Sequence, residues 1–220
     1  MTDRQPRRPR RRRSHEVSTR NVRVREELTR ICIDLLLEHG WDGVRVTEVA
    51  RSAHVSHSKI YLLFGSRDGL LVNAIDSWAA TAMPTPARLA ITRPVRDALA
   101  SATSALVEPW AQNATMLHAL RSAMDRPGGE RLMHRIADHA HTTIGTAIRA
   151  SHGELAVDAD RTICQVITAV IGGTCLGAGS PEAIRRTVQQ TIHRLTACDQ
   201  HAHDSPARAS TPPRRAARGH

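Results

Sequence analysis

Residues 24–78 show a regular series of apolar repeats and of residues that begin or end helices, and this pattern constrains the fold more than any other feature of the sequence. Apolar residues recur at intervals of three and four between Val24 and His39, which predicts an amphipathic helix. Gly40 follows at once, where a left-handed cap would end that helix. The last helix of this region is expected to start at Ser66. No segment alternates with the period of two that strands show, so we predict an all-α fold.

Two short helices lie between these longer ones. The sequence predicts one over residues 46–53, a tight turn at residues 53–56, and a second from Ser56 to about Phe64. Two helices of about eight residues joined by a short turn, behind one longer helix, are the layout of a helix-turn-helix. We place this motif at about residues 45–64.

The same stretch carries a specific residue pattern. After Gly40–Trp41 the motifs V-x-E-V-A, A-x-V-S, I-Y-x-x-F and S-[KR]-[DE]-x-L occur in register over residues 44–71. The only Tyr and the only Phe in the chain, Tyr61 and Phe64, fall where this pattern has aromatics. With these motifs, residues 22–82 resemble the DNA-binding domain of the tetracycline-repressor (TetR) family of transcriptional regulators.

The resemblance implies an N-terminal three-helix DNA-binding module over residues 22–82 and a helical effector-binding and dimerisation domain over residues 83–200. Three residues depart from the family pattern. His54 replaces the usual Gly of the turn, and it must tolerate a positive φ there. Arg45 stands where Ser or Thr commonly caps the second helix, and Leu63 replaces a His.

The expected DNA contacts lie on the second helix of the motif, at the start of the first, and at the start of the helix that follows the motif. His57, Ser58 and Lys59 begin the helix that would enter the major groove, and Lys59 can donate to guanine. Thr47 matches a position that reaches a base edge in relatives, whereas Tyr61, Arg45 and Arg67 would contact phosphates. The alternative for each is a solvated side chain. The candidate DNA-binding residues are Arg45, Thr47, Ser56, His57, Ser58, Lys59, Tyr61 and Arg67.

The net charge of +10 belongs to the two ends of the chain. Residues 1–13 hold seven Arg against one Asp, and residues 201–220 hold four Arg against one Asp. We expect residues 1–21 to form a disordered Arg-rich arm and residues 201–220 a disordered basic tail. Residues 14–82 carry a net charge of −1, so the arm is expected to supply attraction by entering the minor groove. The alternative is a solvated tail.

Helical stretches are predicted in the second domain over residues 94–108, 113–125, 129–151, 158–177 and 181–197. The last two carry Ile- and Val-rich stripes and form a hairpin. The resemblance implies that this hairpin packs against its mate in a second subunit, and intrachain packing is the alternative. The predicted dimer contacts are Ile163, Ile167, Val170, Ile184, Val188 and Ile192.

A cluster of Trp and Met residues between the two regions is the predicted lining of an effector cavity, with a plain core as the alternative. Its members are Trp78, Met83, Trp110, Met116, His118, Leu120 and Met124. His134, Asp138 and His141 share one helical face, but they flank an apolar stripe as solvated residues normally do. We therefore predict no metal site.

Several classes of protein are excluded. The sequence has no apolar run of membrane-spanning length and no signal peptide, which predicts a cytoplasmic protein without membrane contact. Four cysteines without C-x-x-C spacing suit small core residues in a reducing compartment. No nucleophile elbow, P-loop or dinucleotide fingerprint occurs, so neither catalysis nor a cofactor is expected.

The leading hypothesis is a homodimeric repressor that binds palindromic double-stranded operator DNA. A small-molecule effector, which the sequence does not identify, would release it from the operator. A second hypothesis is an effector-independent protein that uses its basic tails for nonspecific or architectural DNA binding. A third is a helical ligand-binding or enzymatic domain whose helix-turn-helix is incidental. Salt-dependent binding to a short palindrome separates the first from the second.

Overall fold

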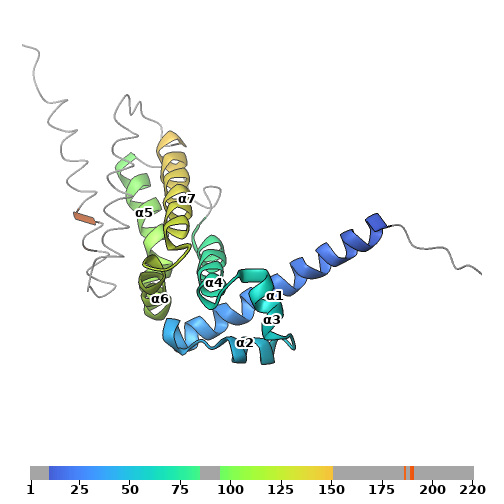
Figure 1. The fold of residues 1–220 in the computed structure, drawn as a ribbon. Coiled ribbons are helices and arrows are strands. Elements are labelled where there is room, and N and C mark those ends of the chain that lie inside the picture. The colour runs from blue at the N-terminus through green and yellow to red at the C-terminus, as the bar shows by residue number, and fades with distance from the viewer. Residues whose placement is uncertain (1–9, 85–94, 151–185, 187–188, 191–220) are drawn as a thin grey trace, which may run out of the picture.

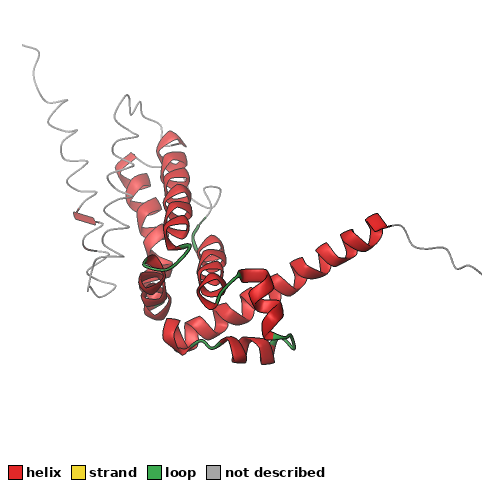
Figure 2. Ribbon diagram, in the orientation of Figure 1, coloured by secondary structure: helices red, strands yellow, loops and turns green. Residues whose placement is uncertain are grey.

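The computed structural model describes residues 10–84, 95–150, 186 and 189–190. Within these ranges the chain is helical, without strands, and the predicted all-α class is confirmed (Figures 1 and 2). The helices are α1 (Arg10–Gly43), α2 (Val46–Ser52), α3 (His57–Phe64), α4 (Arg67–Ala82), α5 (Val95–Gln112), α6 (Ala114–Met124) and α7 (Gly129–Ala150).

The first helix begins earlier than predicted. Residues 10–21 were expected to belong to a disordered arm, yet they are helical and continue into the packed part of α1. Arg is a good helix former, and a helix nucleated by its packed stretch gains one hydrogen bond for each residue added. The N-terminal part of α1 projects from the body of the molecule (Figure 1). Residues 1–9 lie outside the described ranges.

Gly40 ends the regular part of α1, as predicted. Its φ of 69° and ψ of −175° belong to a region that is essentially restricted to glycine. A Cβ at this position would stand 3.5 Å from Thr115 Cγ2 of α6, so the corner lies against the second domain. Trp41 follows and is buried. The turn at Gly40 therefore lies where α1, the approach to α2 and the second domain meet.

One hydrophobic core extends through both parts of the molecule. Helix α4 packs against α1 and α3 on one side and against α6 and α7 on the other (Figure 1). The edge of the Trp78 ring meets the Trp110 ring at 4.8 Å between centroids, which joins α4 to α5. Helix α4 thus belongs to the DNA-binding module by sequence and to both regions by packing.

The described part of the second domain follows the predicted helices closely, with one correction. The helix predicted to end at residue 108 instead continues past Pro109 to Gln112. A proline removes one backbone donor, and here the helix ends only three residues later. Asn113 then donates its side-chain amide to the Pro109 carbonyl at 2.8 Å. The predicted hairpin over residues 158–197, its dimer contacts and the basic tail lie outside the described residues, apart from 186 and 189–190.

Cys32 is a small core residue, as predicted. It is fully buried in α1, and this burial raises the pKa of its thiol to about 12, against a smaller opposing effect of Arg67. The other three cysteines lie outside the described ranges. Among the helices described, none is both long and apolar enough to cross a membrane.

Candidate nucleic-acid interface

The turn between α2 and α3 is built from backbone hydrogen bonds around His54. The amide of His54 donates to the Arg51 carbonyl at 3.2 Å, and the amide of Val55 donates to the Ala50 carbonyl at 3.0 Å. These two bonds form a Schellman motif, whose central residue takes a left-handed conformation. His54 has a φ of 52°, which confirms the predicted positive φ at a residue that is not glycine.

The caps of the two helices differ as their sequences predict. The Ser56 hydroxyl accepts from the Lys59 amide at 3.3 Å and begins α3. Arg45 precedes α2 without any side-chain cap, and its carbonyl accepts from the Glu48 amide at 3.0 Å. The Arg45 side chain is exposed and so is available to a phosphate.

Helix α3 turns one face to the core and another to solvent. Ile60 is fully buried, and Leu63 and Phe64 are half-buried against the core. The exposed residues of α3 are His57, Ser58, Tyr61 and Leu62, which recur with helical spacing and share one outward face. Arg45, Thr47 and Ser56, the other candidates in the motif itself, are also exposed.

Lys59 has a partner that the sequence did not indicate. Its ammonium group donates to Asn21 Oδ1 at 2.5 Å, across the junction between α3 and the N-terminal part of α1. The two residues stand 38 positions apart, so no local pattern could connect them. In the free protein the only lysine of the chain is therefore held by α1.

Arg67 also has intramolecular partners, although 31% of its side chain is exposed. Its guanidinium donates to the Val44 carbonyl at 3.0 Å and to the Trp41 carbonyl, and it lies over the Trp41 ring, 5.7 Å from the centroid. Asp68 forms an ion pair with Arg67, with 3.5 Å between Asp68 Oδ1 and Arg67 Nη1. These contacts tie the approach to α2 onto the start of α4, and the phosphate contact of Arg67 stays a prediction.

Arg25 performs a similar task for α3 and was missed by the sequence analysis. It donates to the Leu63 carbonyl at the C-terminal end of α3 and lies 4.7 Å from the centroid of the Phe64 ring. A cation at this end of a helix binds free carbonyl groups and complements the helix dipole. Helix α1 therefore holds α3 at two points, through Asn21 and Arg25.

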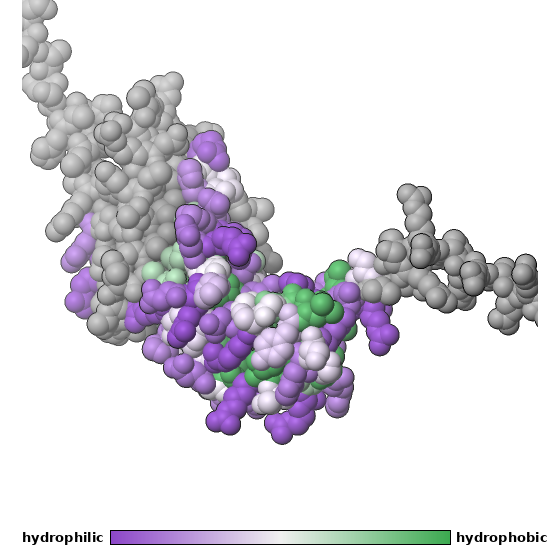
Figure 3. Space-filling model, in the orientation of Figure 1, coloured by the Kyte–Doolittle hydropathy of each residue, from purple (hydrophilic) through white to green (hydrophobic). Residues whose placement is uncertain are grey.

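The space-filling view shows the hydrophilic side chains of this region (Figure 3). They follow the lower edge of the molecule, where Figure 1 places α2 and α3, around a smaller apolar area. Arginines of α1, of α2 and at the position before α2 are exposed, among them Arg20, Arg23, Arg25, Arg45 and Arg51. This mixture of cations, hydroxyls and apolar groups suits contact with phosphates and base edges.

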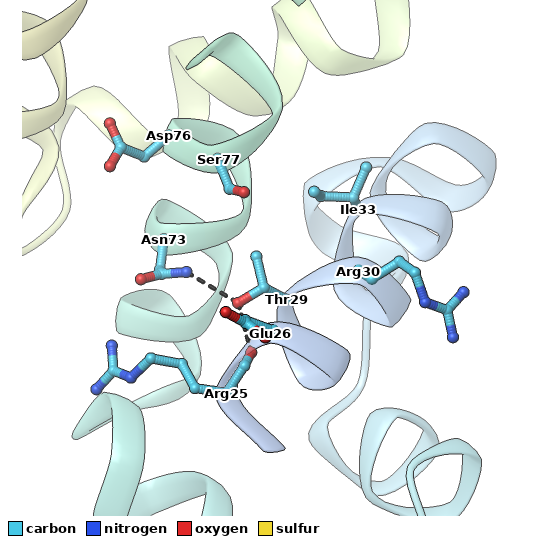
Figure 4. A pocket seen from close by; sticks show the side chains of 8 residues that line it. All are labelled: Arg25, Glu26, Thr29, Arg30, Ile33, Asn73, Asp76 and Ser77. Carbon is cyan, nitrogen blue, oxygen red and sulfur yellow. Dashed lines mark hydrogen bonds between the residues drawn. The ribbon is translucent and has the colours of Figure 1, made fainter. Parts of the chain in front are cut away.

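A pocket of about 460 Å³ lies between α1 and α4 (Figure 4). Several of its polar groups bind protein partners. Asn73 donates to the Thr29 hydroxyl at 3.0 Å, and Asp76 pairs with Arg135 at 2.7 Å. These groups support the packing of α1, α4 and α7. The lining residues are Arg25, Glu26, Thr29, Arg30, Ile33, Asn73, Asp76 and Ser77.

The residues predicted to line an effector cavity divide between core and surface. Trp110, Met116 and Leu120 are buried in the core, whereas His118 and Met124 are exposed. Met83 is buried and also lines a cavity of about 290 Å³ between α4 and α7. For the buried members, burial is compatible both with the predicted cavity lining and with the plain-core alternative. A pattern of apolar residues predicts burial but does not distinguish a packed core from a cavity wall.

Comparison with known proteins agrees with this arrangement. Residues 33–74 match the profile of the bacterial regulatory proteins of the tetR family. The motifs over residues 44–71 lie on the corresponding elements, from the approach to α2 through the first turn of α4. No curated protein matches the sequence significantly.

Three solved structures share the fold over most of their length. A TetR transcriptional regulator from Rhodococcus sp. RHA1 superposes with a TM-score of 0.61 at 15% identity, covering 79% of this chain and 96% of that one. A tetR-family regulator from Streptomyces coelicolor gives 0.58 at 17%, covering 83% of each chain. A TetR transcriptional regulator from Agrobacterium tumefaciens gives 0.52 at 20%, covering 79% and 93%.

At such identities the structures establish the fold, and the matching profile points to a regulator with a DNA-binding helix-turn-helix rather than to an enzyme. The capped turn, the outward face of α3 and the motifs over residues 44–71 agree with that assignment. Residues 33–74 carry the helix-turn-helix of the tetR family of bacterial regulatory proteins, and the chain has the fold of solved TetR-family regulators.

Proposed function

We propose that this protein is a cytoplasmic homodimeric repressor that binds a palindromic operator and is released by a small-molecule effector. The observation that carries the proposal is the polar, exposed face formed by α3 and the start of α2. Arg45 and Tyr61 would contact phosphates, while Thr47, His57 and Ser58 would reach base edges. Lys59 joins them once its ammonium group leaves Asn21, and Ser56 supports them as the cap of α3.

Dimerisation follows from the reading of two half-sites. One module on one half-site loses the gain in affinity that comes from tethering two modules. The proposed contacts lie on the Ile- and Val-rich hairpin over residues 158–197. Such a hairpin would bury its two apolar stripes against a second copy of itself.

Release by an effector needs a mechanical link between the two regions. Helix α4 provides one, because Asp76 pairs with Arg135 of α7 at 2.7 Å and His139 of α7 contacts the Pro84 carbonyl at 3.0 Å. A ligand that binds one arrangement of α7 better than another would shift the population of α4 positions. The distance between the two copies of α3, the recognition helix of each subunit, would then change.

A second candidate function rests on the charge distribution. Nearly all of the net charge lies in residues 1–13 and 201–220, as in proteins that coat DNA without strong sequence preference. The four arginines of residues 10–13 open α1, so they would approach DNA on a helix that also contacts α3. We include this segment in the repressor proposal as a source of phosphate contacts.

Selection of bound duplexes from a random pool, followed by titration at several salt concentrations, tests the proposal. A repressor should select one palindrome and prefer it over random DNA by about a thousandfold or more. Deletion of residues 1–13 should reduce the log–log salt slope by roughly 3–4 units, if each subunit places two arginines on phosphates. Binding without sequence preference would favour the coating function instead.

A further inference from the structure

Leu62 is the most exposed large apolar side chain in the described ranges, with 75% of its surface accessible. Three others in those ranges are also exposed: Val22, Tyr61 and Met124. Two of these four side chains belong to the eight-residue helix α3, and Val22 neighbours Asn21, which binds Lys59 of α3. Exposed apolar groups are thus concentrated around the recognition helix.

The core of the protein does not require a leucine at this position. The inward apolar groups of α3 are Ile60, Leu63 and Phe64, whereas Leu62 shares the outward face with Ser58, one turn earlier. A single exposed leucine is common on protein surfaces. Here, however, the residue stands among the polar groups proposed to enter the major groove, where a large apolar group needs an apolar partner.

We infer that Leu62 recognises the C5-methyl group of a thymine in each half-site, an inference that rests on the proposed DNA contacts of α3. The thymine methyl is the apolar feature that base pairs present in the major groove, and neither cytosine nor uracil carries it. Leucine offers no hydrogen bond, so it would read this methyl group by burial alone. Because Leu62 lies about 6 Å along the helix axis from Ser58, its thymine should lie roughly two base-pair steps from the base that Ser58 approaches.

The experiment replaces that methyl group and that side chain in turn. The preferred duplex is first selected from a random pool with the full chain. Each of its thymines is then changed to deoxyuridine, and affinity is measured by fluorescence anisotropy. At one position in each half-site, loss of the methyl group should weaken wild-type binding by about fourfold for each group removed. Leu62→Ala should bind the thymine and uracil duplexes equally.

Leu62→Met is the matched control, because it retains an apolar side chain of similar volume and should still prefer thymine. Circular dichroism and thermal melting of each variant establish that the helices are intact. If Leu62→Ala shows the same thymine preference as wild type, another residue reads the methyl group and the inference is wrong. If light scattering shows that Leu62→Ala alters the oligomeric mass instead, Leu62 is a protein contact. Absence of any sequence preference in the wild type would overturn the proposed function itself.

Discussion

The helix-turn-helix and the described helices of the second domain were predicted from different kinds of signal. The Ser56 cap of α3, a left-handed turn residue and a fixed motif specify α2 and α3, and each of these acts within a few residues. Apolar periodicity alone specifies α5, α6 and α7. The first kind of signal identifies outward residues such as His57 and Tyr61, which are exposed as expected. The second kind identifies buried residues such as Met116 without stating what they pack against.

This difference decided which site predictions agree with the structure. Polar residues on a short amphipathic helix can be assigned to solvent, and thereby to a partner, from their spacing. Apolar residues such as Trp110 and Leu120 are needed by the core whether or not a ligand binds, and the structure buries them there. The outward positions on α3 were therefore predictable in a way that the surroundings of apolar residues in the second domain were not.

The largest expected effect would break the second domain's proposed role in assembly. Ile184→Glu with Val188→Glu places four like charges at the proposed two-fold contact, and their desolvation should cost several kcal/mol. Light scattering should report about half the mass, operator binding should collapse, and the far-UV circular dichroism should stay helical. Gln189→Glu with Gln190→Glu adds the same charges at exposed positions of the same segment and should remain dimeric. A dimeric Ile184/Val188 variant would place the interface elsewhere.

Two substitutions in α3 sharpen the picture of its outward face. Lys59→Ala should relax preference at one base position by about 1–3 kcal/mol, because alanine cannot donate to the base edge that the ammonium group is proposed to reach. Tyr61→Phe removes a hydroxyl proposed to bind a phosphate and should weaken binding to every sequence similarly. Titrations against the operator and against single-base variants measure both effects. If both variants lose affinity equally on operator and random DNA, Lys59 does not read a base, and the proposed difference between Lys59 and Tyr61 is wrong.

A pair of arginines tests which cations support the fold and which face DNA. Arg67→Ala should lower the free energy of unfolding by about 2 kcal/mol, because the Val44 and Trp41 carbonyls lose a charged donor. Arg45→Ala should leave stability unchanged but reduce the salt slope of DNA binding by about 1 for each phosphate that Arg45 neutralises. Urea denaturation and salt titration measure the two quantities. If Arg67→Ala keeps wild-type stability but binds DNA more weakly, the result would favour a phosphate contact of Arg67 over a structural role.

Two glycines contrast the corner of the DNA-binding module with the interior of the second domain. Gly40→Ala should destabilise by about 1–2 kcal/mol, because its backbone conformation is strained for any residue with a Cβ. Gly145→Ala in α7 should stabilise by roughly 0.5–1 kcal/mol, since the nearest obstacle is the flexible end of Arg149. Both changes are followed by urea denaturation. Equal responses would show that the Gly40 corner is not specified by its backbone.

The smallest expected effect concerns the turn of the motif. His54 has a φ of 52°, which favours glycine, while a glycine there raises the entropy of the unfolded chain. His54→Gly should therefore stabilise by only about 0.5 kcal/mol and leave DNA affinity unchanged. Thermal melting and anisotropy are the measurements. A clear loss of stability would reveal a contact of the imidazole that the backbone argument omits.

The sequence by itself determined the helical class, the helix-turn-helix with its caps and left-handed residues, and the outward position of most candidate contacts. These features depend on neighbours within about one helical turn, so spacing and residue type are sufficient. The start of α1 at Arg10 was missed because a helix extends by propagation without an apolar face of its own.

Only the tertiary structure decided the partners of the cations. Lys59 meets Asn21 from 38 positions away and Arg67 reaches Val44 from 23 positions away, so these contacts exist only after α1, α3 and α4 have packed. The burial of Trp110 and Met116 likewise follows from how α4, α5 and α6 meet. Hydrogen bonds and core contacts between distant segments depend on how the helices pack in three dimensions, which local spacing along the chain does not encode.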